Sequence, residues 1–382
     1  MEEALTTGYT AAKYGSFLEM RTIVEQHTEA AVAYKDSDSK YTYLHQVAWH
    51  GNVSEALWLV ARGASATARN RRNETPAETA TRRGYVACAQ VLEAAASISE
   101  CSATQTSAAD TPILVISDPH GNLSLVLDAL QRGARAVGRP DLTVVLLGDF
   151  CDNGPEIPAL LDFLCGVNEA GGKFGPMTFL PILGNHDMAC LLALEPTAFG
   201  STPTATTWWQ RWHRFWNPGY GTPELYGCSP GCSVDAFRDA FPADHKRFLL
   251  ALPWHVDLDG YVFVHAGLHE DTAAHPLDAQ LAFLRARDLS RLAASGFESY
   301  KGGGYGMPDH ITNKEWKAVS TPRWGRIVVT GHNKYGNHAD LVTPHRLGLH
   351  SAACVRRYAH QGSNSSQHRV LSSTSACAHV PQ

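Results

Sequence analysis

Five short polar segments, each placed directly after an apolar run, restrict the fold of this chain more than any other feature of its sequence. The apolar runs are short, rich in β-branched residues and bounded by turns, which predicts buried strands. Each following segment carries Asp, Asn or His side chains, the types that can ligate metal ions. In chain order, the runs and their segments are 113–116 with Asp118-Pro119-His120, 142–147 with Gly148-Asp149-Phe150-Cys151-Asp152, 179–183 with Gly184-Asn185-His186-Asp187, 261–264 with His265-Ala266-Gly267, and 327–329 with Gly331-His332-Asn333.

The positions of these segments predict one shared site. A side chain at the carboxyl end of a buried strand leaves the sheet into a loop, so five strand ends can aim their ligands at one point. Imidazole with carboxylate and amide oxygen suits manganese, iron or zinc in a hydrolytic pair, whereas thiolates would indicate a structural zinc site. Two cations also need a bridging anion, which the carboxylate of Asp149 can supply. We therefore predict a two-metal hydrolytic site.

Composition sets the broad class of protein. The 382 residues are 44% hydrophobic and 18% charged, which allows two domains and argues against both global disorder and a membrane protein. No apolar run approaches the ~18 residues of a membrane span. A net charge of −5 without a dense basic segment argues against a nucleic-acid partner. Nine widely spread cysteines fit a reducing compartment, so we expect a cytoplasmic protein, with the nucleus as the alternative.

The first 95 residues contain a repeat of 33 residues. The segment 42–51 recurs as 75–84, and each copy has a threonine before a short helical pattern and a glycine after it. This pattern resembles ankyrin repeats, which stack into a shared core and offer a concave surface to a protein partner. The resemblance implies partner binding. The alternative is that these few repeats only dock on the larger domain and extend its core.

The remainder, from residue 111 to about 360, resembles the calcineurin-like metallophosphoesterases, and among them the PPP-type phosphatases of bacterial style. The order of the five metal motifs carries the resemblance. The loop 217–222, the segment 263–268 and a single His332 with Lys334 two places on match the PPP branch as well. The resemblance implies an α/β fold, a two-sheet sandwich flanked by helices, after an all-α ankyrin-repeat domain.

We accordingly predict four parts of the chain. They are an ankyrin-repeat domain at 1–95, a linker at 96–110, a metallophosphatase domain at 111–360 and a polar tail at 361–382. The linker is rich in Ser, Thr and Ala, and the tail is rich in Ser and poor in core residues, so we expect the tail to be disordered.

The resemblance also implies roles for individual residues. Asp149 would bridge the two ions, which would be manganese, with iron or zinc as alternatives. A hydroxide between the ions would be the nucleophile, and His186, oriented by Asp152, would protonate the leaving oxygen. Asp118, His120 and Asp149 would hold the first ion, and Asp149, Asn185, His265 and His332 the second.

Two features depart from the PPP pattern or leave it open. Where phosphoprotein phosphatases usually have a phosphate-binding arginine, this chain has Asn153, whose amide offers only neutral donors. Arg285 is expected to be a second phosphate-clamping arginine, with Arg287 as its rival.

Between the third and fourth motifs, Trp208, Trp212 and Trp216 share a helical face, which favours packing on the sheet over stacking on a substrate ring.

These observations lead to one preferred function and two alternatives. We predict a metal-dependent phosphoester hydrolase acting on phosphoserine or phosphothreonine proteins. The first alternative is a dinucleoside polyphosphate or cap-like pyrophosphate hydrolase, which the motifs 184–187 and 265–268 also fit. The second is an inactive scaffold with a phosphatase fold, motivated by Asn153 but weakened because every metal position is occupied by a suitable ligand.

Overall fold

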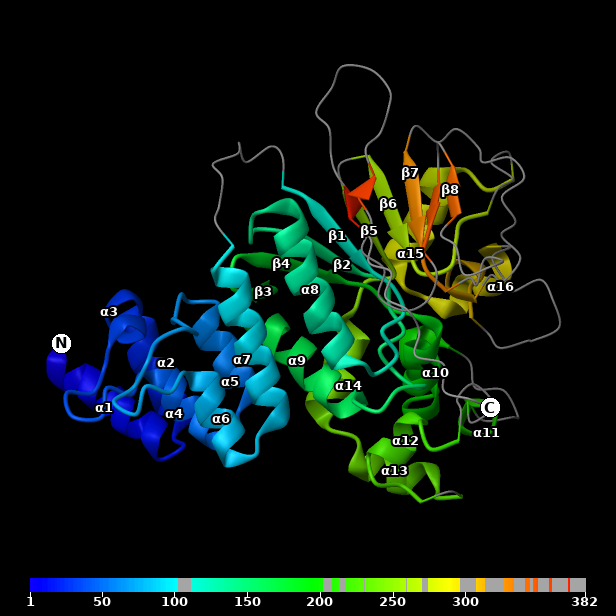
Figure 1. The fold of residues 1–382 in the computed structure, drawn as a ribbon. Helices are drawn as coiled ribbons and strands as arrows, with labels where there is room; N and C mark the ends of the chain where they lie inside the picture. Colours follow the sequence, from blue (N-terminus) through cyan, green and yellow to red (C-terminus); the bar gives the residue numbers. More distant parts are fainter. Residues whose placement is uncertain are drawn as a thin grey trace, which may run out of the picture.

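The structure is a computed structural model in which an N-terminal group of helices lies against a mixed α/β region (Figure 1). No helix of its described part is long and apolar enough to cross a membrane. The described residues are 1–101, 111–201, 208–212, 218–229, 231–258, 260–269, 274–295, 307–312, 326–332, 341–343, 346–349, 357–358 and 370–371.

The 33-residue repeat folds as two similar pairs of helices. Thr42 and Thr75 cap α4 and α6, since each hydroxyl accepts the backbone N–H three residues later. Gly51 and Gly84 end these helices in the left-handed conformation that glycine adopts readily. The N-terminal helices are α1 (Glu2–Lys13), α2 (Phe17–Gln26), α3 (Thr28–Ala33), α4 (Tyr43–His50), α5 (Val53–Val60), α6 (Pro76–Arg83) and α7 (Val86–Ser99).

The last N-terminal helix, α7, runs past the predicted start of the linker at residue 96. Helix α7 continues to Ser99, so residues 96–99 of the predicted linker are helical. The reason is that the run of Ala, Val, Leu and Ile in α7 buries Ala94, Ala95 and Ile98 in the core and so extends the helix past the repeat. Residues 102–110 lie outside the described part of the chain.

The α/β region contains two sheets, as the sequence predicts. The first has the order β10-β11-β1-β2-β4-β3 and the second β5-β6-β7-β9-β8. The strands are β1 (Ile113–Ile116), β2 (Thr143–Leu146), β3 (Lys173–Phe174), β4 (Met177–Pro181), β5 (His255–Leu258), β6 (Tyr261–Val264), β7 (Ile327–Thr330), β8 (Leu341–Thr343), β9 (Arg346–Gly348), β10 (Arg357–Tyr358) and β11 (Val370–Leu371).

The sheets pack face to face through alternating apolar residues. Val115 of β1 and Val145 of β2 share one buried cluster with Phe263 of β6 and Val329 of β7. Their neighbours in sequence, such as Leu114, belong to the other cluster, on the helix side. This alternation follows from the period of two in a strand and gives β1, β2, β6 and β7 one face toward the other sheet and one toward a helical layer.

Helices cover the outer faces of this sandwich. The longest, α8 and α9, begin immediately after the loops that follow β1 and β2. The helices are α8 (Leu123–Val137), α9 (Ile157–Glu169), α10 (Asn185–Leu194), α11 (Trp208–Trp212), α12 (Thr222–Leu225), α13 (Val234–Ala240), α14 (Ala243–Ala251), α15 (Leu277–Ala286), α16 (Leu292–Ser295) and α17 (Asp309–Thr312), with 3-10 turns at Ala198–Gly200 and Leu289–Arg291.

Two residues of the predicted polar tail form a strand. Strand β11, at Val370–Leu371, lies inside the predicted polar tail at 361–382 and pairs in parallel with β1. The physical reason is that the open edge of β1 presents unpaired backbone groups, which a short β-branched and apolar stretch can satisfy.

The N-terminal helices are joined closely to α8 and α9 (Figure 1). Gly166 of α9 permits this approach, because a Cβ there would lie 2.7 Å from Leu57 Cδ1 of α5. Arg21 connects the two parts through Glu55 and Glu169, each at about 3 Å. The helical region therefore supports the same two helices that leave the metal-motif loops.

Candidate metal centre

The carboxyl ends of five strands bring the predicted metal ligands together. Strands β1, β2 and β4 are neighbours in one sheet and run in parallel, as do β6 and β7 in the other. Their ends therefore meet at one edge of the sandwich. Asp118 follows β1, Asp149 follows β2, Asn185 begins α10 after β4, His265 follows β6 and His332 follows β7.

Close backbone contacts bring these loops within ligand distance of one another. Gly148 lies so near Gly184 that a Cβ on Gly148 would be 2.4 Å from the Gly184 nitrogen. The backbone N–H of His120 donates to the Asp149 carbonyl at 2.8 Å, which joins the loop after β1 to the loop after β2. A larger side chain at Gly148 would separate Asp149 from Asn185.

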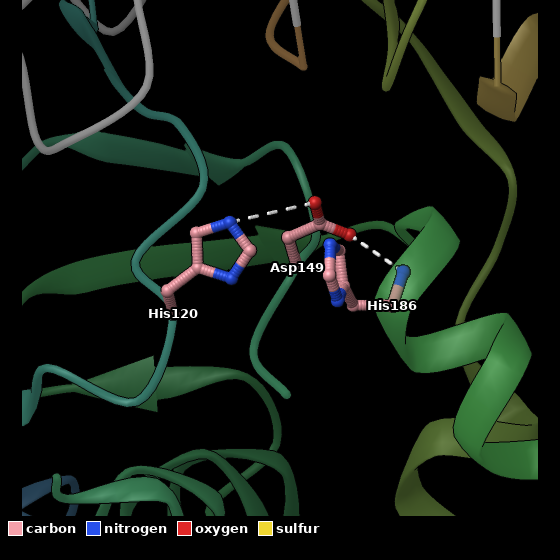
Figure 2. A group of neighbouring side chains, drawn as sticks. All are labelled: His120, Asp149 and His186. Carbon is pink, nitrogen blue, oxygen red and sulfur yellow. Dashed lines mark hydrogen bonds and ion pairs between the residues drawn. The ribbon is translucent and has the colours of Figure 1, made fainter. Parts of the chain in front are cut away.

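Asp149 lies at the centre of two groups of candidate ligands. The first contains His120, Asp149 and His186, and the second contains Asp149, His265 and His332; within each group the ligand atoms lie within 4.8 Å of one another. Figure 2 shows the Asp149 carboxylate between the two imidazole rings of the first group. Asp149 Oδ2 is 3.8 Å from His120 Nε2 and 3.5 Å from His265 Nε2. This placement agrees with a bridging carboxylate.

The other two predicted ligands lie in the same cluster. His265 Nε2 is 2.9 Å from Asn185 Oδ1 and 3.2 Å from His332 Nδ1. Asp118 Oδ1 is 4.0 Å from His265 Nε2, and the Asp118 carboxylate accepts the backbone N–H of His332 at 3.0 Å. The structure thus brings together all six residues that the sequence nominated as metal ligands.

The hydrogen bonds of two imidazoles make the cluster suitable for cations. His265 Nδ1 faces the Leu147 carbonyl at 2.5 Å, and His120 Nδ1 faces the Cys151 carbonyl at 3.1 Å. A carbonyl can only accept, so both Nδ1 atoms carry hydrogen and Nε2 is the ring nitrogen that can offer a lone pair to a cation. These lone pairs point at carboxylate and amide oxygens, and a divalent cation stabilises such a convergence of donors. The residues present therefore fit a divalent ion pair.

The backbone of the site is strained. Non-glycine residues with left-handed backbone are uncommon, and each costs about 1 kcal/mol or more. Here they are concentrated in the metal-motif loops, which indicates that the surrounding fold holds the ligands in place for a function. The residues are Asp118, His120, Asp149, Asp152, Asn153 and His332, with φ between 43° and 64°.

Electrostatics keep the central carboxylate ionised. Burial raises the pKa of Asp149, but the imidazoles of His265, His186 and His120 outweigh burial and hold the pKa below its ordinary range. For Asp118 the balance differs, because burial raises its pKa more than His265 lowers it. A bound cation would favour the ionised form of both carboxylates.

His186 and Asp152 form the pair that the sequence predicts. His186 Nδ1 donates to Asp152 Oδ2 at 2.8 Å. Burial lowers the pKa of His186, but the carboxylates of Asp149 and Asp152 overcome this and raise it to about 9. The metal-free site therefore keeps this imidazole protonated at neutral pH. The His186 ring also lies against that of His120, with centroids 4.9 Å apart at 90°.

The residues that hold the Asp152 carboxylate in place were not predicted from the sequence. Trp212 Nε1 donates to Asp152 Oδ2 at 2.8 Å, and the Thr222 hydroxyl and backbone N–H donate to Oδ1 at 2.7 and 3.0 Å. Trp212 also packs on Phe237 of α13, a helix, whereas the sequence predicted packing on the sheet. Thr222 belongs to the segment 217–222, which resembles a loop of the PPP-type phosphatases. That resemblance was the only feature of the sequence that could have indicated a role for Thr222. The side chains of Trp208 and Trp216 lie outside the described part.

Asp187 is a third residue whose importance the sequence did not reveal. Its two carboxylate oxygens are fully buried and accept four backbone N–H groups, and so hold the loop after β2 against the start of α10. The donors are Gly184 at 3.0 Å, Asp149 at 2.9 Å, Phe150 at 2.9 Å and Cys151 at 3.0 Å. Its position two residues after Asn185, in the third metal motif, was the feature of the sequence that could have indicated this role.

Replacing Asp187 with asparagine is expected to destabilise the fold by about 3 kcal/mol and to weaken metal binding. One carboxylate oxygen becomes an NH₂ group that faces two buried N–H donors. Urea unfolding measures the first effect and metal content after dialysis the second. Asp128→Asn, an exposed change on α8, is the matched control. Equal stability and metal content in the Asp187 and Asp128 variants would show that the four hydrogen bonds do not hold the site.

The two candidate arginines lie apart from the hydrogen-bonding network of the metal centre. Arg285 is 59% exposed, and its guanidinium is 3.9 Å from Asp257 of β5. Arg287 turns back to the carbonyl of Ala251 at 3.3 Å. These contacts do not support a phosphate clamp, and the role of Arg285 stays a prediction. Asn153 lies in the site loop, where its backbone N–H donates to the Tyr220 carbonyl at 2.8 Å.

One family model matches the part of the chain that carries this site. Residues 111–332 match the family described as calcineurin-like phosphoesterase. No curated protein sequence matches the chain significantly.

Three solved structures illustrate the structural likeness. A cold-active protein-tyrosine phosphatase of a psychrophilic Shewanella is 15% identical, with 65% of this chain and 76% of that chain covered and a TM-score of 0.38. A protein serine/threonine phosphatase from Saccharomyces cerevisiae is 15% identical, with coverages of 71% and 77% and a TM-score of 0.37. A metallophosphoesterase from Sphaerobacter thermophilus is 18% identical, with coverages of 68% and 74% and a TM-score of 0.29.

Proposed function

Since this chain belongs to the calcineurin-like phosphoesterases and is a phosphoric ester hydrolase, we propose that it is a two-metal phosphatase of phosphoserine and phosphothreonine proteins. The observation that carries the proposal is the position of Asp149. It belongs to both groups of converging side chains, and His186, a member of the first group, is hydrogen-bonded to Asp152. One buried carboxylate shared by two ligand groups is the arrangement that a pair of hydrolytic cations requires.

The proposed ligand sets are those of the sequence analysis. The ions, when bound, supply an activated water and neutralise charge on the phosphoryl oxygens. Manganese is the proposed native ion, with iron and zinc as alternatives, because the donors are imidazole, carboxylate and amide oxygen. Asp118, His120 and Asp149 would hold one ion, and Asp149, Asn185, His265 and His332 the other.

The protein's own contribution to bond cleavage is a proton. His186 holds it on a ring that Asp152 orients through Nδ1, so Nε2 is the atom that can give a proton to the leaving oxygen. Trp212 and Thr222 keep the Asp152 carboxylate in place and so fix the direction of the ring. An alkoxide from serine or threonine is a poor leaving group, and this donation matters most for such substrates.

The N-terminal helices are proposed to be ankyrin repeats that bind a protein partner in the cytoplasm. The capping boxes at Thr42 and Thr75 and the matching glycine ends support the repeat assignment. A protein-binding module attached to the phosphatase fold favours phosphoprotein substrates over free nucleotides. Asn153, which lacks the charge of an arginine, keeps dinucleoside polyphosphates as the second candidate substrate class.

Metal removal tests the proposal directly. The full chain is stripped with a chelator, restored with Mn²⁺ and assayed on p-nitrophenyl phosphate, a phosphoserine peptide and diadenosine tetraphosphate. We expect no turnover without metal and at least about a hundredfold recovery with Mn²⁺, greatest in kcat/KM for the phosphopeptide. A higher kcat/KM for diadenosine tetraphosphate than for the phosphopeptide would instead favour dinucleoside polyphosphates as the substrate class. Absence of Mn²⁺-dependent turnover on all three would contradict the enzymatic proposal and favour a scaffold.

A further inference from the structure

A basic surface in the N-terminal helical region takes no part in the proposed catalytic centre. The stretch 69–83 carries five arginines and two glutamates, although the whole chain has a net charge of −5. Helix α6, which ends this stretch, lies beside α4 (Figure 1). Exposed positive charge concentrated in an acidic protein indicates a surface that attracts acidic groups. The five arginines, all of them exposed, are Arg69, Arg71, Arg72, Arg82 and Arg83.

Trp49 of α4 holds two of these arginines. The guanidinium carbon of Arg82 is 5.1 Å from the centroid of the Trp49 ring, and that of Arg83 is 4.4 Å from it. The Trp49 side chain is itself partly exposed. These cation–π contacts order two flexible side chains before any partner arrives, so less rotamer freedom is lost on binding. Trp and Arg are also the residue types that contribute most to the binding energy of protein interfaces.

The two glutamates of the stretch neutralise only part of its charge. Glu74 Oε1 accepts Arg82 Nε at 2.9 Å, and Arg82 Nη2 also lies 3.4 Å from the Tyr41 hydroxyl. Glu78 Oε2 is 3.4 Å from Arg69 Nη1. The arginines that form no ion pair with any described residue are Arg71, Arg72 and Arg83. The surface therefore keeps guanidinium groups that a partner's carboxylates can reach.

The local chemistry favours an acidic peptide over RNA. Glu74 and Glu78 lie among the arginines and repel a continuous phosphate backbone, whereas the acidic side chains of a peptide can be spaced to avoid them. Single-stranded RNA binding also relies on an open aromatic face for base stacking, and two guanidinium groups already lie over Trp49. Carboxylates accept paired hydrogen bonds from guanidinium groups, which suits the arginines present.

We propose that Trp49, Arg72, Arg82 and Arg83 form a docking surface for an acidic segment of a partner protein. Arg72 and Arg83 supply the charges that meet the partner, while Trp49 and Glu74 hold Arg82 in place. The docking surface rests on the protein-binding role proposed for the N-terminal helices and gives their partner a stated chemistry. Because these side chains are exposed, salt weakens the interaction, with a screening length of ~8 Å at physiological ionic strength.

Peptide selection on the full chain tests the docking surface. A random peptide library displayed on phage is selected on the wild-type protein, and the enriched peptides are synthesised with a fluorescein label. We expect several Asp or Glu side chains in each enriched peptide. Fluorescence anisotropy at low salt should then give an affinity at least about tenfold lower for Arg83→Glu than for the wild type, because the change replaces an attraction with a repulsion. Arg72→Glu should lower the affinity as well.

An arginine elsewhere on the surface provides the matched control. Arg247→Glu makes the same charge change on α14, at a side chain that is 72% exposed, and should leave peptide affinity at the wild-type value. Enriched peptides without acidic residues, or equal affinities in the wild type, Arg83→Glu and Arg247→Glu, would overturn the docking surface. Tighter binding of a single-stranded uridine oligonucleotide than of the peptides, lost in Arg83→Glu, would also overturn it and assign the surface to RNA.

The binding measurement is independent of catalysis. It follows no turnover and needs no metal, and Asp149→Asn should bind the selected peptides as tightly as the wild type. Failure of peptide binding in a protein with Mn²⁺-dependent turnover would reject the docking surface alone. Peptide binding that depends on Arg83, in a protein without turnover, would reject the phosphatase proposal and leave the docking surface supported.

Discussion

Replacing Asp149 with asparagine is expected to lower Mn²⁺-dependent phosphatase activity by at least about a thousandfold, because the change removes the one carboxylate shared by both ligand groups. The amide is neutral and keeps a single oxygen, so it cannot offer a charged oxygen to each of two cations. The measurements are kcat for p-nitrophenyl phosphate at saturating Mn²⁺ and metal content after dialysis. We expect fewer than two ions per chain.

The Asp149 variant also needs a control for folding. Asp149 Oδ1 accepts the backbone N–H of His186 at 2.9 Å, and an asparagine oxygen can keep this bond. Asp244→Asn, an exposed change on α14, is the matched control and should retain wild-type activity. Urea unfolding of both variants shows whether the loss is local. Two bound ions and full activity in the folded Asp149 variant would disprove the bridging role.

Replacing His186 with asparagine is expected to slow hydrolysis by roughly 10²–10⁴-fold while two ions remain bound. The reason is that His186 donates the proton to the leaving oxygen and is not among the six proposed metal ligands. Leaving-group dependence distinguishes the two roles. The loss should be about tenfold greater for a phosphoserine peptide than for p-nitrophenyl phosphate, whose phenolate leaves without a proton. Equal losses on both substrates, or loss of an ion, would assign His186 to metal binding.

The pH profile adds a second signature of His186. The proton-bearing form is the active one, and its pKa in the metal-free site is raised to about 9 by Asp149 and Asp152 against the opposing effect of burial. The rate should therefore fall as pH rises through the pKa of this group, which bound cations lower from about 9. The alkaline fall should be absent from the His186→Asn variant. A profile of unchanged shape in that variant would contradict proton donation.

Local patterns in the sequence were sufficient to nominate the proposed ligands, because the placement of these residues follows from local physics. A short apolar run makes a buried strand, and a polar residue at its carboxyl end emerges at the sheet edge, so Asp118, Asp149 and His265 could be nominated without knowing the topology. The threonine and glycine caps of α4 and α6 likewise depend on residues only a few positions away.

The residues that hold the site residues in place come from distant parts of the chain, so they could not be predicted from local sequence patterns. Asp152 meets Trp212 and Thr222, which lie 60 and 70 positions along the chain. Arg285 was placed by motif likeness alone, and the turn of α15 directs it to Asp257. The register that adds β11 to β1 is equally a matter of which edge remains open after the core has packed.

By itself, then, the sequence of this protein determined which side chains end the buried strands and where the helix pairs are capped, because both follow from spacing along a few residues. Only the tertiary structure decided that Asp187 holds two loops through four backbone hydrogen bonds and that Gln280 of α15 joins the segments of His269 and His310. These contacts join segments that lie far apart in the sequence, and sequence separation does not predict the distance between them in space. The packing of helices on the two sheets brings the segments together.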